Sequence, residues 1–147
     1  MAATTFLACD LGAESGRALS GSFDGVRLEV EQVHRFPNRA VRVRDSLHWD
    51  VLALYAGIQD GLAAHVARHG AGLKSVGIDT WGVDFALLAA DDTLAGLPYH
   101  YRDRRTEGML QIALQQLGRE EIFGFTGVQF LEFNTLYQLL AMHRGGA

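Results

Sequence analysis

Residues 8–17 read Ala8-Cys9-Asp10-Leu11-Gly12-Ala13-Glu14-Ser15-Gly16-Arg17, an apolar stretch that runs into a glycine-containing turn. The apolar run over residues 5–11 predicts a buried strand. Two glycines and a serine predict a tight turn over residues 12–16, and a second strand is expected over about residues 17–23. The chain therefore begins with a strand, a turn and a second strand.

The next signal is Asp24-Gly25, a dipeptide typical of β-hairpins. The partner strand is expected over about residues 26–36, with Pro37 at its end. Its alternation places Val26, Leu28 and Val30 on one face and Arg27, Glu29 and Glu31 on the other. These signals together predict a three-stranded antiparallel meander.

A long helix is expected after the meander. Asp50 can cap its N-terminus, and Gly70 can follow its last residue, His69. The apolar residues that recur at helical spacing are Val51, Leu54, Tyr55, Ile58, Leu62 and Val66. Residues 38–48, which are polar and contain three arginines, are expected to be irregular.

The rest of the sequence predicts two strands, over residues 73–79 and 83–89, and helices over 103–117, 119–125 and 135–142. A meander followed by a helix and by a strand beside the first one is the order of a ribonuclease-H-like or actin-like ATPase half. We therefore expect an α/β fold with a mixed sheet, incomplete in this chain. In that architecture the glycine turn after the first strand faces a nucleotide phosphate.

Composition narrows the function classes. The chain has 147 residues, enough for one domain, and a formal net charge of −4, which disfavours a nucleic-acid binder. The single cysteine, Cys9, allows no internal disulfide and favours the cytoplasm. The first ten residues do not resemble a signal peptide, and no apolar run approaches the roughly 20 residues of a membrane span.

Two stretches can carry chemistry. In the first, a carboxylate at a strand end, Asp10, can hold a hydrated Mg²⁺, while small residues let backbone N–H groups approach phosphate oxygens. Ser15 and Arg17 can add hydrogen-bond donors. The alternative is an ordinary hairpin turn with a surface aspartate, since the stretch is neither a Walker A loop nor a dinucleotide fingerprint.

The second stretch is residues 77–85, Gly-Ile-Asp-Thr-Trp-Gly-Val-Asp-Phe. The Trp81 indole can support an apolar sugar face, Gly82 admits close approach, and carboxylates accept hydrogen bonds from hydroxyl groups. The alternative is a tight β-turn with Trp81 in the core.

The remaining candidate residues are expected to have structural roles. The charged run over residues 99–106 indicates a solvated helix start, with Asp103 near the N-terminus. Asn134 is expected to cap a helix, and Cys9 to be a small core residue. His65 and His69 lack the intervening glutamate of a zinc-binding helix, so a zinc site is disfavoured.

Taken together, the chain resembles the rhamnulokinase group of the FGGY carbohydrate kinases. The segments that carry the resemblance are residues 8–17, 34–38, 77–85, 101–106 and 127–139, in the right order along the chain. The segment 77–85 distinguishes the rhamnulokinase group from the other FGGY kinases, because glycerol kinases and xylulokinases have a different sequence there.

The resemblance implies an actin-like fold and MgATP-dependent phosphorylation of L-rhamnulose to L-rhamnulose 1-phosphate. The residues that match the ATP-phosphate loop are Ala13, Glu14, Ser15, Gly16 and Arg17. Asp10 matches the aspartate near the metal, which it would hold through water. Gly82 matches a sugar-binding position, and Trp81 and Asp84 beside it are expected sugar contacts. The expected partners are thus a small sugar and ATP, with no nucleic acid and no membrane.

One departure concerns the chemistry. The family's general base is an aspartate in a His-Asp-Thr segment, and no such segment occurs in residues 1–147. The resemblance therefore implies that these residues are the N-terminal, partial kinase domain, without a catalytic residue of their own. An incomplete sheet would also favour self-association. The alternative is a non-enzymatic truncated module that binds sugar or nucleotide, or that only assembles with a partner.

Overall fold

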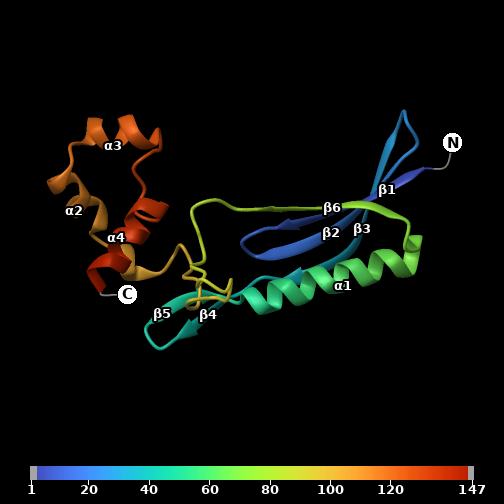
Figure 1. Cartoon of the computed structure of the whole chain (residues 1–147), viewed down its shortest axis with the longest axis horizontal. Coiled ribbons are helices and arrows are strands. Elements are labelled where there is room, and N and C mark those ends of the chain that lie inside the picture. Colours follow the sequence, from blue (N-terminus) through green and yellow to red (C-terminus); the bar gives the residue numbers. More distant parts are fainter. Residues whose placement is uncertain (1–2, 146–147) are drawn as a thin grey trace. The chain divides into compact units, whose positions relative to one another are not determined.

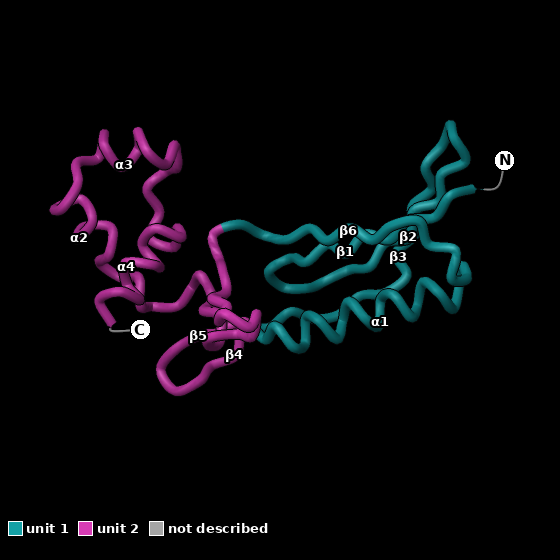
Figure 2. The backbone as a smooth tube through the Cα atoms, in the orientation of Figure 1, with its two compact units in different colours: residues 1–39, 50–82 teal, residues 40–49, 83–147 magenta. Residues whose placement is uncertain are grey.

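The computed structural model describes residues 3–145. The chain divides into two compact units (Figure 2). The first unit takes the residues up to 39 together with 50–82, and the second takes 40–49 and the residues from 83 on. No helix among residues 3–145 is long and apolar enough to cross a membrane.

The first unit is a four-stranded sheet with one long helix (Figure 1). The strand order is β3-β2-β1-β6, built from β1 (Thr4–Leu11), β2 (Ser15–Phe23), β3 (Leu28–Pro37) and β6 (Leu73–Thr80). The first three strands pair antiparallel, and β6 pairs parallel with β1. This confirms the predicted meander and the predicted strand beside the first one.

The predicted hairpin at Asp24-Gly25 is also confirmed. The Asp24 carboxylate accepts hydrogen bonds from the backbone N–H groups of Val26 and Arg27, both at 2.8 Å. Gly25 has φ +102°, a left-handed conformation that costs glycine little. The aspartate and the glycine therefore each serve the turn for a separate physical reason.

The predicted helix is α1 (Val51–His69), with the expected residues at both ends. The Asp50 carboxylate accepts a hydrogen bond from Ala53 N at 3.0 Å, and Gly70 N donates to the Val66 carbonyl at 2.9 Å. The basic side chains Arg68 and His69 lie in the last turn, where the helix dipole favours positive charge.

The buried face of α1 differs from the expected apolar stripe. Its buried residues are Leu54, Gly57, Gly61 and His65, whereas Tyr55 is 61% exposed and Val66 is 44% exposed. The reason is the close approach of helix and sheet, which only glycines permit. A Cβ at Gly57 would overlap the Phe36 ring, and one at Gly61 would lie 2.6 Å from the Ala18 Cβ.

The core of the first unit lies between α1 and one face of the sheet. Its buried residues are Leu7, Cys9, Ala18 and Val33, with Ile58 and Leu62 of the helix packed against them. Burial raises the pKa of the Cys9 thiol, as expected for a core cysteine. The expected apolar face of β3 is not buried, since Leu28 is 57% and Val30 60% exposed.

In the second unit, two sequence predictions are wrong. Residues 40–49 form a hairpin, β4 (Ala40–Val43) with β5 (Ser46–Trp49), because apolar and polar residues alternate there despite the arginines. The strand expected over residues 83–89 does not form. Val83 has φ +71°, which breaks an extended chain, and Leu88 makes only an isolated bridge to Leu94.

The helices of the second unit lie between residues 104 and 145. They are a short 3₁₀ helix η1 (Arg104–Thr106), α2 (Met109–Gln116), α3 (Arg119–Thr126) and α4 (Thr135–Gly145). The helix expected over residues 103–117 is divided because Gly108 adopts φ +78°. The helices share a core of Ala113, Ile122 and Tyr137.

Candidate functional site

The turn after β1 is held by main-chain hydrogen bonds and by Asn38. Gly12 N donates to the Ser15 carbonyl at 3.0 Å, which closes the turn. The Asn38 side chain donates to the Gly12 carbonyl at 2.9 Å, and Asn38 N donates to the Glu14 carbonyl at 3.0 Å. Asn38 is 5% exposed, so a buried amide fixes the turn. Asn38 lies in a segment that carries the resemblance, but no role was predicted for it from the sequence.

Gly16 is needed for packing beneath this turn. A Cβ at Gly16 would overlap the Phe36 ring, and a Cβ at Gly57 would overlap the same ring. The ring is therefore enclosed by two glycines, one from β2 and one from α1. Of the other residues matched to a phosphate loop, Glu14 and Arg17 are exposed, and Ala13 and Ser15 are half-buried.

Charged side chains gather at this end of the sheet. Arg17 Nη1 lies 3.6 Å from Asp10 Oδ2, with both side chains 45% exposed. In the strand register, Asp10 has Arg17 as its partner on β2 and Asp79 as its partner on β6. Arg35 Nη2 donates to Ser15 Oγ at 3.3 Å. Two guanidinium groups and two carboxylates thus flank an exposed turn with backbone N–H groups.

Trp81 and Gly82 end the first unit. Trp81 packs against the core residues Leu11, Phe36 and Leu54. This contact fits the alternative that Trp81 is a core residue, and it also fits an indole that is covered on one side and could support a sugar on the other. A Cβ at Gly82 would meet nothing within 4 Å, so there is open space beside this residue.

Asp84 belongs to the second unit and accepts hydrogen bonds from three directions. Its Oδ2 accepts from the Trp49 indole N–H at 2.6 Å and from Tyr101 N at 3.3 Å. Its Oδ1 accepts from Gln138 Nε2 at 2.8 Å. One carboxylate therefore ties β5, the loop before η1 and α4 together. Trp49 and Gln138 were assigned no role from the sequence, and their spacing from Asp84 gives no local signal.

Gln138 is the centre of this network and is 1% exposed. Its amide nitrogen also lies within hydrogen-bond distance of the Val83 carbonyl, at 3.2 Å, and of the Phe133 carbonyl, at 3.0 Å. Thr135 Oγ1 donates to the Val83 carbonyl at 2.6 Å. These bonds hold Val83 in its left-handed conformation, which costs a β-branched residue free energy.

Aromatic rings surround the Asp84 network. The rings of Trp49 and His100 stack with centroids 3.9 Å apart, and the rings of His100 and Tyr101 stack at 4.6 Å. Tyr101 meets Phe133 edge-on at 5.9 Å. Burial lowers the pKa of His100, against the attraction of Asp84, so the imidazole is mostly neutral at pH 7.

The charged run before α2 begins a helix as expected, but it is not the solvated helix start that the sequence predicts, because His100, Asp103 and Thr106 are buried. Asp103 is buried and caps η1 by accepting from Arg105 N at 3.0 Å. Its second oxygen accepts from Leu47 N at 2.6 Å, which ties η1 to β5. Arg104 points to solvent and pairs with Glu107.

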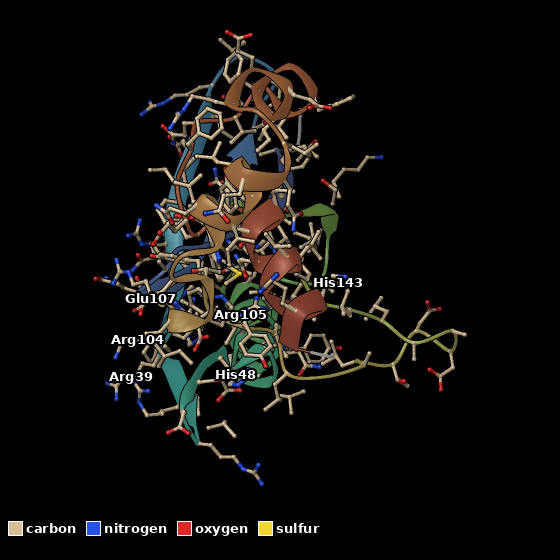
Figure 3. All side chains as sticks on the ribbon, turned by 90° about the vertical axis from the view of Figure 1, so that its left-hand side faces the viewer. Arg39, His48, Arg104, Arg105, Glu107 and His143 are labelled. Atoms are coloured by element: carbon tan, nitrogen blue, oxygen red, sulfur yellow. The ribbon has the colours of Figure 1, made fainter. Side chains whose placement is uncertain are left out.

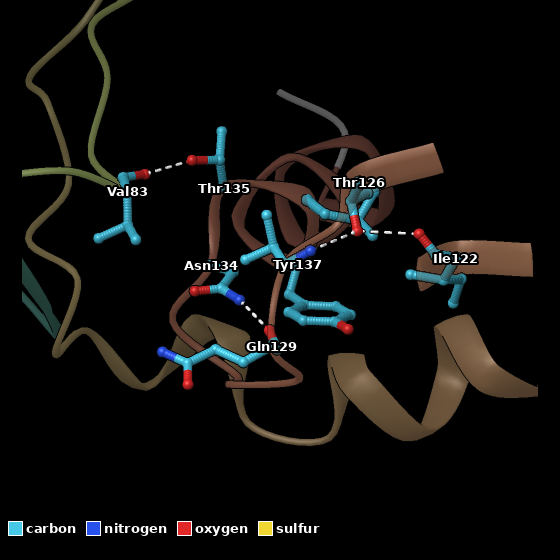
Figure 4. Close-up of a pocket in the computed structure, with 9 residues that line it drawn as sticks. Val83, Ile122, Thr126, Gln129, Asn134, Thr135 and Tyr137 are labelled. Atoms are coloured by element: carbon cyan, nitrogen blue, oxygen red, sulfur yellow. Dashed lines mark hydrogen bonds between the residues drawn. The ribbon is translucent and has the colours of Figure 1, made fainter. Parts of the chain in front are cut away.

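A pocket of about 310 Å³ lies against α4 (Figure 4). Its lining includes Val83, Thr126, Gln129, Asn134 and Tyr137. Asn134 donates its side-chain amide to the Gln129 carbonyl at 2.5 Å, whereas the expected cap of α4 is supplied by the Asn134 carbonyl, which accepts from Tyr137 N at 2.9 Å.

Within residues 3–145 there is no group of three or more His, Cys, Asp or Glu side chains that could hold a metal ion alone. His65 is fully buried, and its Nδ1 lies 3.1 Å from Ser20 Oγ. A metal at the Asp10 end of the sheet would therefore need ligands from water or from a substrate.

Comparison with known proteins gives a consistent result. No family model matches the chain. It is 46% identical over 139 residues to the rhamnulokinase of Bacteroides thetaiotaomicron, covering 95% of this chain and 28% of that protein. It is 48% identical over 138 residues to the rhamnulokinase of Klebsiella pneumoniae (92% and 28%) and 43% identical over 144 residues to that of Pectobacterium atrosepticum (97% and 29%).

Solved structures agree on the fold. A gluconate kinase of Lactobacillus acidophilus matches 99% of this chain and 29% of that chain with a TM-score of 0.81 at 12% identity. A Plasmodium falciparum glycerol kinase with ADP matches 97% and 29% with a TM-score of 0.74 at 11% identity. The chain thus spans under a third of the length of the proteins it matches. In sequence the chain is similar to the N-terminal part of rhamnulokinases, and it has the actin-like ATPase fold of the sugar kinases that match its structure.

Proposed function

We propose that the chain is the N-terminal part of the kinase domain of an ATP-dependent sugar kinase that converts L-rhamnulose to L-rhamnulose 1-phosphate in rhamnose catabolism. The observation that carries this proposal is an identity of 43–48% to rhamnulokinases over at least 92% of the chain. Because the chain spans 28–29% of those relatives, the activity belongs to the proposal for the whole protein. We also place that protein in the cytoplasm.

The proposed ATP-phosphate site is the turn after β1, with Ala13, Glu14, Ser15, Gly16 and Arg17. Its support is the geometry of the turn: the Asn38 side chain holds the Gly12 carbonyl, Glu14 and Arg17 are exposed, and Ala13 and Ser15 are half-buried, whereas Gly16 is buried and packs against Phe36. The guanidinium groups of Arg17 and Arg35 add positive charge beside it. Glu14 is exposed, so its backbone rather than its carboxylate suits a phosphate.

Asp10 would hold Mg²⁺ through water, and its register partner Asp79 adds a second carboxylate at the same strand ends. Carboxylate oxygens and water suit this ion, which keeps several of its waters in protein sites. When bound, the ion would neutralise phosphate charge during transfer. Arg17, whose guanidinium lies 3.6 Å from the Asp10 carboxylate, would attract the phosphates.

The proposed sugar contacts are Trp81, Gly82 and Asp84. The open space beside Gly82 supports close approach of a ligand, and the half-buried Trp81 leaves part of its indole accessible. Asp84 accepts three hydrogen bonds within the second unit. Besides contacting the sugar, it would therefore hold the side chains of Trp49 and Gln138 in place.

The proton acceptor for the attacking hydroxyl is expected to be an aspartate of a His-Asp-Thr segment, which the 147 residues do not contain. Transfer would then follow from alignment of the sugar hydroxyl with the γ-phosphate and removal of its proton. The residues of this chain would bind the ATP phosphates, orient the sugar and neutralise the phosphate charge.

The test is ADP release from MgATP by the complete protein that carries this chain, with L-rhamnulose, L-fuculose, D-xylulose and glycerol compared. We expect selectivity for L-rhamnulose. We further expect Asp10→Asn to lower kcat about 100-fold or more with little change in KM for the sugar, because charge stabilisation acts in the transition state. Equal turnover of all four sugars would contradict the proposed substrate. An unchanged kcat in Asp10→Asn would contradict the proposed role of Asp10.

A further inference from the structure

A second pocket of the second unit, of about 470 Å³, combines an apolar wall with two basic side chains. Phe85, Leu87, Leu97 and Met142 contribute to the wall, and the basic residues are His48 and Arg105. We call this cavity the Arg105 pocket. Its volume is that of a small-molecule site.

Arg105 carries a positive charge that Asp103 and Asp84 attract from nearby but that no carboxylate of the described residues contacts as an ion pair. Its Nη2 donates to Gln138 Oε1 at 2.7 Å and its Nη1 lies 3.4 Å from the Gln138 carbonyl, both neutral acceptors. Its Nε is buried without a hydrogen-bond partner. In the described part of the chain no carboxylate forms an ion pair with Arg105, whereas the neighbouring Arg104 pairs with Glu107.

The Arg105 guanidinium is also partly removed from water. Burial lowers the pKa of Arg105, which means that water solvates its charge poorly. The guanidinium carbon lies 3.8 Å from the centroid of the Tyr99 ring, so one face of the group is covered. A partly desolvated cation that lines a cavity favours binding of an anion there.

His48 adds a second polar group to the same pocket. Its Nδ1 lies 3.2 Å from the Leu97 carbonyl and must therefore carry the hydrogen, so Nε2 is an acceptor in the neutral ring and a donor only when the ring is protonated. Its ring lies 4.5 Å from the Tyr99 ring, which Arg105 also contacts. In Figure 3 His48 is labelled just below Arg105, and Arg104 and Glu107 are labelled to the left of both.

We propose that the Arg105 pocket binds a small organic anion, an apolar body that ends in a carboxylate or a phosphate group. The anionic group would meet Arg105, joined by His48 Nε2 when that ring is protonated, and the apolar body would lie against Phe85, Leu87 and Leu97. None of the residues that line the pocket is among the proposed ATP or sugar contacts, and the proposal stands whether or not the kinase proposal holds.

Calorimetric titration of the 147-residue chain tests the proposal with four probes. Phenyl phosphate and benzoate carry both features, inorganic phosphate lacks the apolar body, and benzyl alcohol lacks the charge. We expect one or both organic anions to bind about tenfold or more tightly than benzyl alcohol and inorganic phosphate. Comparison of the two organic anions identifies the preferred headgroup. Binding of benzyl alcohol as tight as that of both anions, or no binding of either anion, would overturn the proposal.

A matched pair of variants localises the binding without removing Arg105, whose loss could disturb Gln138. Leu87 lines the pocket and is 45% exposed, so a polar side chain can replace it. The variants Leu87→Glu and Leu87→Gln introduce side chains of the same shape that differ in charge. We expect Leu87→Glu to weaken the anion about tenfold relative to Leu87→Gln. Arg104→Gln, outside the pocket, should leave binding unchanged. Equal affinities of the two Leu87 variants would contradict the assigned place.

Discussion

The turn after β1 and the loop around Asp84 both carry proposed site residues, but they are held in place differently. The turn is closed by main-chain bonds, such as Gly12 N to the Ser15 carbonyl, over a ring enclosed by glycines. Asp84 is held by side chains 35 and 54 residues away in the sequence, Trp49 and Gln138. The turn should therefore tolerate most changes to its own exposed side chains but no added volume at Gly16, and Asn38 is the distant side chain that supports it, while the loop should depend on several such polar groups.

The largest effect is expected for Gly16→Ala in the first unit. The new Cβ would push against Phe36, and Gly57 on the other side leaves the ring no room to move without contact with the helix. We expect a loss of about 3 kcal/mol in the free energy of unfolding, measured by urea denaturation. Gly77→Ala is the matched control, because a Cβ at Gly77 meets nothing within 4 Å. Equal losses in both variants would show that the enclosed ring is not the cause.

A loss of about 2 kcal/mol is expected for Gln138→Leu in the second unit. Leucine has a similar volume, but it leaves the Val83 carbonyl and Asp84 Oδ1 without the amide that binds them. The variant should also change the near-ultraviolet circular dichroism, since Trp49 shares the Asp84 carboxylate. The control is Gln115→Leu, at an exposed position of α2. If the Gln138 variant were as stable as this control, the loop around Asp84 would not depend on this polar side chain, and the proposed difference from the turn after β1 would be wrong.

The smallest effect concerns acid stability. Burial, and then the positive charge of His69, lower the pKa of His65 below its usual value near 6.5. The folded state therefore favours the neutral imidazole, and its contribution is complete above pH 6.5 and declines as the pH falls below that value. We expect His65→Gln to flatten the decline in stability between about pH 6.5 and pH 5. The exposed residue His143 provides the control, since His143→Gln should leave the slope unchanged.

Much of the first unit could be predicted because its signals are local. Asp24-Gly25 defines a hairpin, and Asp50 and Gly70 define the ends of a helix, each through contacts within four residues. The buried face of α1 could not be predicted from apolar periodicity. Gly57 and Gly61 line that face because the sheet lies close to the helix, which is a property of the packed structure.

The second unit was predicted less well for the opposite reason. The alternation in residues 40–49 was concealed by arginines that a hairpin places in solvent, and the apolar residues 83–89 fail as a strand because Val83 is held in a left-handed conformation. Gln138, which holds it, lies 55 residues away. Of the candidate site, Asp10, Gly82 and Asp84 could be chosen from sequence, but Asn38, Trp49 and Gln138 act through distant contacts.

The glycines of α1 also bear on the order of folding. Each glycine inside a helix costs about 1 kcal/mol relative to alanine, so a helix with Gly57 and Gly61 has little stability of its own. Phe36 and Ala18, which occupy the space these glycines leave, lie on β3 and β2. The helix should therefore become persistent only once the meander offers that surface. The first 37 residues would then act as the template on which the next segment folds.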